Sequence, residues 1–203
     1  QAACAARRHR RPYLMRPCGM LGGWALGQKS LKKKIYMAWR LRRNLNRASA
    51  IHFTTEQERQ TVKPLKLRAG SIVEPGGVDF GEFEQLPANG TFRRRYPQIG
   101  DRPLVVFLGR VHPGKGLEYL VPAMAQVKPA GTMLAVVGPD SRNFQARIES
   151  VASQHGLEDR VIFTGMLKGV DRIAALVDAD LFSLPSDHEN FGVVVVEALA
   201  AGT

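Results

Sequence analysis

The chain has 203 residues, of which 44% are hydrophobic, enough for one large domain or two small ones. Moderate charge and recurring apolar segments exclude a disordered chain, and no apolar run reaches the ~18 residues of a membrane-spanning helix. The net charge of +11 is uneven: residues 1–100 hold 20 Lys and Arg against 6 Asp and Glu, whereas residues 101–203 hold 9 against 12. This asymmetry predicts two domains with different partners.

The chain opens without an initiator Met and without the apolar core of a signal peptide, and we interpret residues 1–8 as the tail of a helix. Cys4 and Cys18 match neither a metal-ligand spacing nor a disulfide framework, so a reducing cytosol is the expected compartment.

The first half carries weak signals for secondary structure. We expect short strands within 12–16 and 50–53, separated by one basic helix, and a linker over 81–102, where Pro, Gly, Asn and Arg are frequent. The apolar face of the expected helix comprises Leu31, Ile35, Ala38, Leu45 and Ala48, and its cations include Lys32, Lys33, Lys34, Arg40, Arg42, Arg43 and Arg47.

From Arg102 onward, short apolar runs alternate with amphipathic segments. The first run, Pro103–Gly109, is β-rich and ends in glycine, as a buried parallel strand does. This alternation predicts an α/β fold with a parallel, doubly wound sheet. The expected strands are 103–109, 133–137, 161–163 and 181–184; the expected helices are 117–127, 144–152, 173–177 and 191–201, with Asp140 or Ser141 capping the second and Gly156 ending it.

The loop Gly109–Gly116 is a candidate ligand site, because ligands of open parallel sheets bind beyond the carboxyl ends of the strands. Its glycines permit close backbone approach, and Arg110 and Lys115 flank the start of a helix whose amides favour an anion. Its spacing differs from that of a Walker loop. The pattern indicates a phosphate or diphosphate site; a solvated turn with two surface cations is the alternative.

The loop after the last strand carries two carboxylates eight residues apart, Glu189 and Glu197. Helical periodicity places Glu197 about two turns into the helix, on the same side as the helix start. Because Glu197 lies among valines and alanines, it needs a partner, and sugar or ribose hydroxyls would serve. A favourable capping charge at the helix N-terminus is the alternative for Glu189. We expect His112 and His188 to be loop residues and not metal ligands.

Together these motifs resemble the retaining glycosyltransferase family 4, the group 1 glycosyltransferases with two Rossmann-like domains (the GT-B fold). The second half contributes Gly109-Arg110 with Lys115-Gly116, Phe163-Thr164-Gly165-Met166-Leu167, the segment 142–161, and Glu189 with Glu197-Ala198-Leu199-Ala200-Ala201-Gly202-Thr203. In the first half, Pro17-Cys18-Gly19-Met20-Leu21 with Trp24-Ala25-Leu26 is similar to the end of the family's acceptor domain, and Val73–Asp79 to its junction with the donor domain.

The resemblance covers nearly the whole chain and implies two Rossmann-like domains, both incomplete. Residues 1–80 would be the last part of the acceptor-binding domain, 81–102 the linker, and 103–203 the nucleotide-sugar donor domain, cut at its C-terminus. Nothing before Pro12 resembles the family's opening strand and Gly-rich loop, and Thr203 precedes the next expected strand. We therefore expect the chain as written to be inactive, and to aggregate or bind nucleotide weakly.

The implied activity is transfer of a hexose from a nucleotide-diphosphate sugar to an acceptor, with retention of configuration. Arg110 and Lys115 would bind the diphosphate and stabilise the leaving nucleotide, so no cofactor and no metal are expected. Glu189 would contact the transferred sugar, and Glu197 the ribose hydroxyls. The further substrate-binding positions would be Gly109, backbone amides near Asn190, Phe191 and Gly192, the backbone of Met166 and Leu167 around the base, and the acceptor-domain loop at Cys18 and Gly19.

Two positions depart from the family pattern. Cys18 stands where the family often carries His or Arg, so a contact to sugar or phosphate would be missing, and we expect a small hydrophobe there and not a nucleophile. Pro75-Gly76-Gly77 replaces the usual Pro-Asn-Gly, a milder change because Asn and Gly both tolerate a positive φ.

Other functions remain open at this point. A nucleotide-sugar epimerase or a phosphorylase would use the same fold, and a sugar-nucleotide assay separates them from a transferase. A basic nucleic-acid-binding module is disfavoured, because stacking on bases requires interleaved aromatic residues and only Tyr36 and Trp39 are at hand. The acceptor would be a polysaccharide or a lipid-linked glycan. The basic helix 29–47 would face solvent or an anionic membrane surface, which makes the expected location cytoplasmic or peripheral at the inner face of the membrane.

Overall fold

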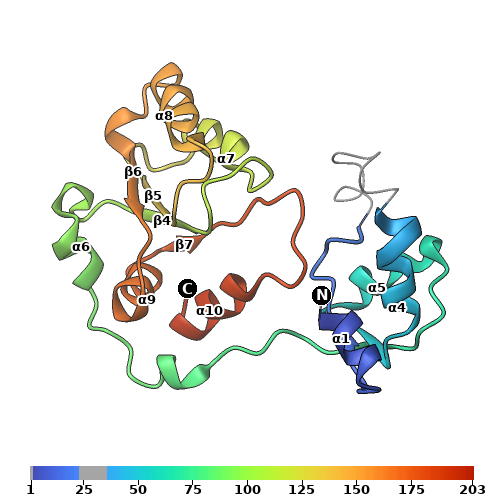
Figure 1. The fold of residues 1–203 in the computed structure, drawn as a ribbon. Helices are drawn as coiled ribbons and strands as arrows, with labels where there is room; N and C mark the ends of the chain where they lie inside the picture. The colour runs from blue at the N-terminus through green and yellow to red at the C-terminus, as the bar shows by residue number, and fades with distance from the viewer. Residues whose placement is uncertain (1, 23–35) are drawn as a thin grey trace. The chain divides into compact units, whose positions relative to one another are not determined.

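The computed structural model describes residues 2–22 and 36–203. Its contacts divide the chain into two units (Figure 1). The first runs to Gly77 and includes Glu189–Phe191; the second comprises Val78–His188 and Gly192–Thr203. Some residues used in the sequence predictions lie outside the described ranges, namely Trp24 to Leu26, Leu31, Lys32 to Lys34 and Ile35.

The first unit contains a three-stranded parallel sheet in the order β1-β2-β3. Strand β2 (Ala50–Phe53) has the predicted bounds, and β1 (Leu14–Met15) lies within the predicted segment. Strand β3 (Ser71–Val73) was not predicted, because three residues before a Pro-Gly-Gly sequence give too short a pattern. The strands bury Ile51 and Phe53 against a small core with Leu21, Leu45 and Val62.

Short helices complete the first unit. They are α1 (Ala2–Arg8), the π-helix η1 (Met37–Leu41), α4 (Arg42–Asn46), α5 (Glu56–Val62) and the 3-10 helix η2 (Lys63–Leu65). Helix α1 confirms the helical tail at the start of the chain. A hydrogen bond from Arg40, followed by the positive charge of the nearby Arg7, lowers the pKa of the Cys4 thiol. Leu45 is buried on α4, as the predicted apolar face requires, whereas Ala48, although buried, lies after the helix ends.

The second unit contains a four-stranded parallel sheet, which confirms the predicted α/β fold. Its strands are β4 (Leu104–Leu108), β5 (Met133–Val137), β6 (Val161–Gly165) and β7 (Leu181–Phe182). They lie in the order β6-β5-β4-β7, so the chain adds two strands on one side of β4 and then crosses to the other side. This is the strand order of a Rossmann half-domain. Every residue of β4 and β5 is buried, as continuous apolar runs in a covered parallel sheet should be.

Helices cover both faces of this sheet (Figure 1). Helices α7 (Leu117–Met124) and α8 (Phe144–Gln154) pack on the face that receives Val105 and Phe107, followed by the 3-10 helix η5 (Glu158–Arg160). Helices α9 (Gly169–Val177) and α10 (Val193–Ala201) pack on the face of Leu104, Val106 and Leu108. Asp140 binds the first amides of α8 through its Oδ1, 3.0 Å from both the Phe144 and Gln145 nitrogens, although the N-cap position itself is Asn143.

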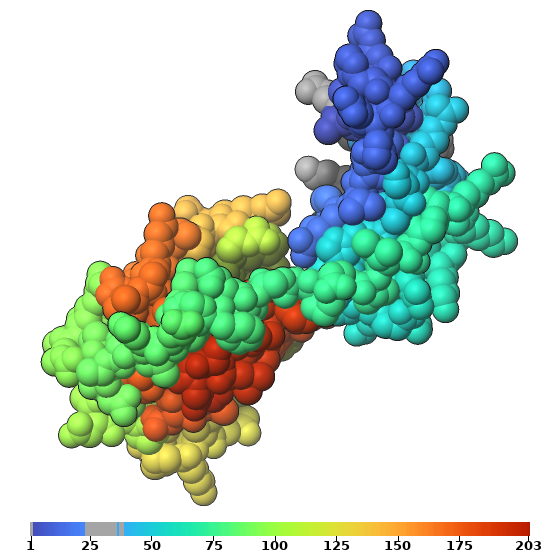
Figure 2. Space-filling view, turned by 90° about the horizontal axis from the view of Figure 1, so that it is seen from below, coloured from blue at the N-terminus to red at the C-terminus, as the bar shows by residue number. Residues whose placement is uncertain are grey.

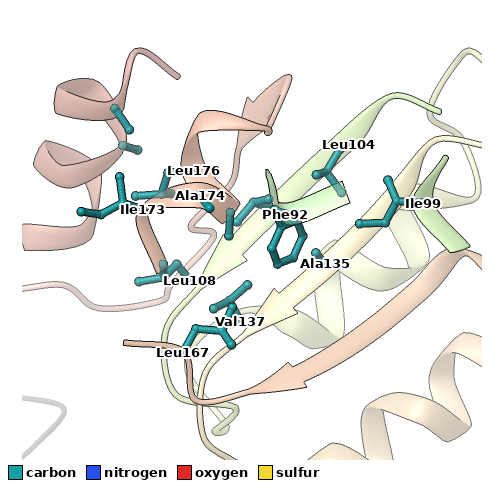
Figure 3. Packing of buried hydrophobic residues seen from close by; sticks show 14 of the residues in the cluster. Phe92, Ile99, Leu104, Leu108, Ala135, Val137, Leu167, Ile173, Ala174 and Leu176 are labelled. Atoms are coloured by element: carbon teal, nitrogen blue, oxygen red, sulfur yellow. The ribbon is translucent and has the colours of Figure 1, made fainter. Parts of the chain in front are cut away.

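The segment 81–102, expected to be a linker, belongs by its contacts to the second unit. It includes the end of the 3-10 helix η3 (Phe80–Phe83), α6 (Thr91–Arg95) and the 3-10 helix η4 (Pro97–Ile99). Figure 3 shows Phe92 and Ile99 packed on the sheet beside Leu104 and Ala135. The Pro, Gly, Asn and Arg content of the segment predicted a linker, although Phe92 and Ile99 are core residues. Its helix α6 also depends on a residue far away in the sequence. Asp178 Oδ2 accepts from the Phe92 amide at 2.7 Å.

Candidate functional site

The geometry of the second sheet places the candidate site between β4 and β7. These two strands are neighbours in the sheet, but they lie at the start and the end of its chain order. The direction of strand addition reverses between them, and a crevice forms beyond the carboxyl ends of strands at such a switch point. The two loops singled out in the sequence, 109–116 and the one after the last strand, leave the sheet there.

Backbone contacts hold these loops together within the second unit. The Asp187 amide donates to the Gly114 carbonyl at 3.1 Å. Gly116 has a φ of +77°, and a Cβ added there would lie 1.9 Å from the Pro185 carbonyl oxygen. On the other side, a Cβ on Gly138 would lie 1.9 Å from the Gly109 carbonyl oxygen. Only glycine permits these approaches, so the glycines bring three post-strand loops to one place.

The loop 109–116 presents the two predicted cations. The side chain of Arg110 is exposed and that of Lys115 is half-buried. The loop ends at Gly116, the N-cap of α7, which has no side chain of its own to accept from the first helix amides. Helix α10 begins in the same way at Gly192, which has a φ of +71°. Helix N-termini carry partial positive charge and point N–H donors outward, which suits an anion.

Glu189 and its neighbours precede α10. Glu189 is exposed, Asn190 and Phe191 are half-buried, and Gly192 is buried. The contacts of Glu189–Phe191 group them with the first unit, whereas Gly192 belongs to the second. The predicted helix start at Phe191 is wrong by two residues, because Gly192 adopts a left-handed conformation and Val193 is the first helical residue.

Glu197 consequently lies just over one turn inside α10, and not two turns as predicted from the sequence. Its side chain is 13% exposed, and its Oε1 forms an ion pair of 2.5 Å with Arg172 Nη1. Its Oε2 is buried and accepts no hydrogen bond from the part of the chain that the structure describes. The expectation that this carboxylate needs a partner is met for one oxygen by Arg172, a residue that the sequence analysis did not single out.

Met166 and Leu167 follow β6 at the carboxyl edge of the sheet. The side chain of Met166 is 61% exposed, and that of Leu167 is buried in the core below. Leu167 can therefore offer a ligand only its backbone, which is the role expected for it. The Gly138 amide donates to the Gly165 carbonyl at 2.8 Å and ties this loop to the one after β5.

Cys18 and Gly19 lie in the first unit, in the loop after β1. Both have a positive φ, +48° and +74°, and Cys18 is exposed. The Gly19 amide donates to Glu58 Oε1 at 2.6 Å, and Glu58 Oε2 accepts from the Thr54 amide and hydroxyl at 2.8 and 3.0 Å. The buried Glu58 therefore holds this loop, and the sequence analysis missed it.

A capping-box pattern could have drawn attention to Glu58, since Thr55 and Glu58 are three residues apart at a helix start. The Thr55 hydroxyl does accept from the Glu58 amide at 3.0 Å. The Glu58 carboxylate, however, binds Thr54 and the distant Gly19, and no local pattern predicts the second contact.

The two histidines of the site loops make local contacts. A ring nitrogen of His112 lies against the Pro113 carbonyl, and His188 Nδ1 lies 3.1 Å from the Asp187 carbonyl oxygen. Across residues 2–22 and 36–203, no three His, Cys, Asp or Glu side chains gather closely enough to hold a metal ion. No helix in those same ranges is both long and apolar enough to cross a membrane.

A Rossmann-ordered parallel sheet, with two cations and two helix N-termini that begin at glycine near its switch point, defines an α/β protein with an arrangement that suits a phosphorylated ligand. Comparison with known families makes the class specific. The chain belongs to the group 1 glycosyl transferases, whose family model matches residues 89–203. A second model, that of a glycosyl transferase 4-like domain, matches residues 1–74.

Two curated relatives illustrate the similarity. A 2-deoxystreptamine glucosyltransferase from Streptomyces kanamyceticus is 35% identical over 167 residues, which is 78% of this chain and 42% of that protein. A GDP-mannose-dependent alpha-(1-6)-phosphatidylinositol monomannoside mannosyltransferase from Mycolicibacterium smegmatis is 34% identical over 138 residues, 63% of this chain and 35% of that protein. The chain thus spans less than half the length of either relative.

Solved structures share the fold over the whole chain. HepE from Anabaena, in complex with UDP and glucose, has a TM-score of 0.83 at 24% identity and is matched over 54% of its length. Sucrose-phosphate synthase from Thermosynechococcus elongatus has a TM-score of 0.79 at 27% identity, with 52% of its length matched. In both comparisons the match covers 100% of this chain, in agreement with the predicted GT-B fold.

Proposed function

We propose that the protein transfers a hexose from a nucleotide-diphosphate sugar to an acceptor, with retention of configuration, and that the switch point between β4 and β7 binds the donor. One observation carries the proposal. The cation loop 109–116 and the loop 185–188 are joined backbone to backbone, beside the N-terminus of α7, whose N-cap residue is a glycine. The UDP and glucose bound by HepE, whose fold this chain shares, support the choice of ligand.

In the proposed reaction, the bond from the sugar to the diphosphate breaks and the diphosphate takes the negative charge. Arg110 and Lys115 would stabilise that charge, together with the first amides of α7 and α10. Such preorganised donors lower a barrier most where charge develops in the transition state. We propose that this arrangement acts without a metal ion or other cofactor.

The remaining donor contacts follow from position in the site. We assign Glu197 to the ribose, since its Oε2 is a buried acceptor that no described donor satisfies, and a hydroxyl would satisfy it. Glu189 would contact the transferred sugar, with Gly109 and the amides of Asn190, Phe191 and Gly192 nearby in the bound complex. The exposed backbone around Met166 would bracket the base.

The acceptor would meet the first unit, at the loop of Cys18 and Gly19. We propose a polysaccharide or lipid-linked glycan as the acceptor class. The phosphatidylinositol monomannoside named for the mycobacterial relative supports a lipid-linked acceptor, whereas the 2-deoxystreptamine of the other relative is a small molecule. Trp39, 86% exposed beside the exposed Arg40, Arg42 and Arg43, supports contact with an anionic membrane surface at the cytoplasmic side.

The test is a panel of nucleotide sugars offered to the protein with its native termini, together with a mixture of glycan and lipid-linked acceptors. We expect release of one nucleoside diphosphate to depend on both donor and acceptor, with the α or β configuration of the donor kept in the product. Epimerised donor without transfer would favour an epimerase. A sugar 1-phosphate formed from inorganic phosphate would favour a phosphorylase, and either result would overturn the proposal.

A further inference from the structure

Arg172 on α9 joins two carboxylates that come from different parts of the chain. Its Nη1 lies 2.5 Å from Glu197 Oε1 on α10, and its Nη2 lies 2.5 Å from Glu82 Oε2 on η3. The Arg172 side chain is 19% exposed, compared with 13% for Glu197 and 49% for Glu82. Figure 2 shows η3, in green, beside α10, in red, on one face of the second unit.

This geometry fixes the direction of the Glu197 carboxylate. A guanidinium is planar and offers its N–H donors in a rigid fork, so a guanidinium anchored at one nitrogen directs the other. Glu82 anchors Nη2, and Nη1 then holds Glu197 Oε1. The second oxygen, Oε2, is buried and has no hydrogen-bond partner in the described ranges.

The charges of the cluster also favour a further donor. Two carboxylates share one guanidinium, and the less exposed of the two, Glu197, has one oxygen buried without a hydrogen bond. Leaving such an acceptor unsatisfied costs free energy, which a ligand hydroxyl would recover on binding.

We propose that Arg172 is a positioning residue for the donor nucleotide: held by Glu82, it orients Glu197 so that Oε2 receives a ribose hydroxyl. The proposal rests on the proposed function, in which Glu197 binds the ribose. Arg172 acts through Glu197 and does not itself contact the ligand. Glu82 is the outer anchor of the arrangement.

The experiment compares a ribonucleotide with the same nucleotide lacking the ribose hydroxyls. In the protein with its native termini, calorimetry measures the dissociation constants of UDP and of 2′,3′-dideoxy-UDP, or of the GDP pair if GDP is the nucleotide bound. For Arg172→Met we expect UDP to bind about tenfold more weakly, the size of one lost charge-assisted hydrogen bond. The affinity for the dideoxy nucleotide should not change, and donor KM should rise while kcat is kept.

Further variants separate positioning from folding. Arg172→Lys should restore part of the preference for the ribonucleotide, and Glu82→Gln should reduce that preference less than Arg172→Met does. Asp171→Asn is the matched control. Asp171 precedes Arg172 and forms an exposed ion pair with Arg95, so its loss should leave the affinity for both nucleotides unchanged. If Arg172→Met does not fold, Arg172→Lys and Glu82→Gln carry the comparison.

Each outcome decides one claim. An equal loss of affinity for both nucleotides, or no loss for either, would show that Arg172 only stabilises the packing of α9 and α10. Either result would overturn the inference. A wild-type protein that binds both nucleotides equally would instead refute the ribose assignment of Glu197, and with it part of the proposed function. Loss of the preference in Arg172→Met with the fold intact supports the inference.

Discussion

At the scale of single residues, Lys115 offers the most direct test of the diphosphate assignment. Lys115 belongs to the loop after the central strand β4 and precedes Gly116, the N-cap of α7. Replacing it with Met keeps the aliphatic stem and removes the charge. We expect nucleoside-diphosphate affinity to fall by one to two orders of magnitude, equivalent to about 1.5–3 kcal/mol for a charge-assisted hydrogen bond.

Calorimetric titration of the nucleoside diphosphate measures the effect, and Lys128→Met is its control. Lys128 is an exposed lysine that precedes β5, and therefore lies at the opposite edge of the same sheet. An unchanged dissociation constant for Lys115→Met would remove the diphosphate assignment, as would an equal loss in both variants.

The two glutamates should lose function in different ways. Glu197→Gln should weaken binding of the free nucleotide, because the amide keeps one acceptor oxygen but loses the charge that pairs with Arg172 and accepts from a hydroxyl. Glu189→Gln should lower turnover and leave affinity for the free nucleotide almost unchanged, since its proposed partner is the sugar. Steady-state kinetics and nucleotide titration on each variant separate the two effects. If both substitutions changed only thermal stability, the two carboxylates would be structural.

At the scale of elements, Gly116 makes the junction between two loops sensitive to a single carbon atom. An alanine there needs a left-handed conformation and places its Cβ 1.9 Å from the Pro185 carbonyl oxygen. The conformational strain alone costs about 1–2 kcal/mol, and the clash adds to it because backbone must move. We therefore expect Gly116→Ala to lower both the free energy of unfolding and the nucleotide affinity.

Gly156→Ala is the matched control for this substitution. Gly156 also has a positive φ, +63°, but a Cβ there would meet no described atom within 4 Å. It should show the strain cost without the clash, and no change in nucleotide binding. Denaturant unfolding of both variants makes the comparison, and equal losses would mean that the approach of the two loops has no energetic weight.

Asp178 binds the segment 81–102, including the start of α6, to the rest of the second unit. It is buried, and its carboxylate accepts from the amides of Gly90, Phe92 and Arg93 at 2.6, 2.7 and 3.0 Å. Removing it leaves these three amides, of which that of Phe92 is buried, without their acceptor. We expect Asp178→Ala to lower the free energy of unfolding by about 3 kcal/mol, since hydrogen bonds to charged groups contribute about 1.5–3 kcal/mol each.

The control for this prediction is the exposed Asp101, at the end of the same segment. Asp101→Ala should stay within about 0.5 kcal/mol of the wild type. A small effect of Asp178→Ala would mean that α6 is held by Phe92 and Ile99 packing alone.

At the scale of the whole molecule, the charge asymmetry should govern where the protein binds. We predict that the protein with its native termini co-sediments with vesicles containing phosphatidylserine, and that Arg42→Gln/Arg43→Gln with Trp39→Ala reduces the bound fraction. Each cation near an anionic surface contributes about 1 kcal/mol, and salt screens it. Tyr119→Ala is a control, since Tyr119 is an exposed aromatic residue on α7 of the other unit. Equal binding to uncharged phosphatidylcholine vesicles would contradict the prediction.

The sequence predicted the second unit far better than the first. The strands β4 and β5 are continuous apolar runs buried on both faces, and β5 was found with its exact bounds because such runs need no long-range information. Strand β3 and the helices α5 and α6 were not predicted, because they are short and are stabilised by tertiary contacts. The carboxylates of Glu58 and Asp178 supply such contacts from 39 and 86 residues away along the chain.

The candidate site shows the same limit. Arg110, Lys115 and Glu197 could be selected from loop position and from a charge in an apolar context, since both are local properties of the sequence. The pairing of Glu82 with Arg172 could not, because these residues are 90 positions apart and neither stands in an unusual context. Local patterns indicate which residues need partners, and only the fold supplies the partners.

The two strands next to the candidate site differ in how many residues pair them to the rest of the sheet. β4 is a five-residue strand paired along its length with β5, whereas β7 pairs with β4 through only two residues, Leu181 and Phe182. Amide hydrogen exchange should therefore be slow along β4 and much faster in β7 and the loop that follows, since local opening breaks few bonds there. A bound nucleotide that touches both loops would slow exchange in the second far more than in the first. Under the proposed function, the loop with the two cations would follow the more firmly paired strand, and donor binding would slow local opening most in the loop after β7.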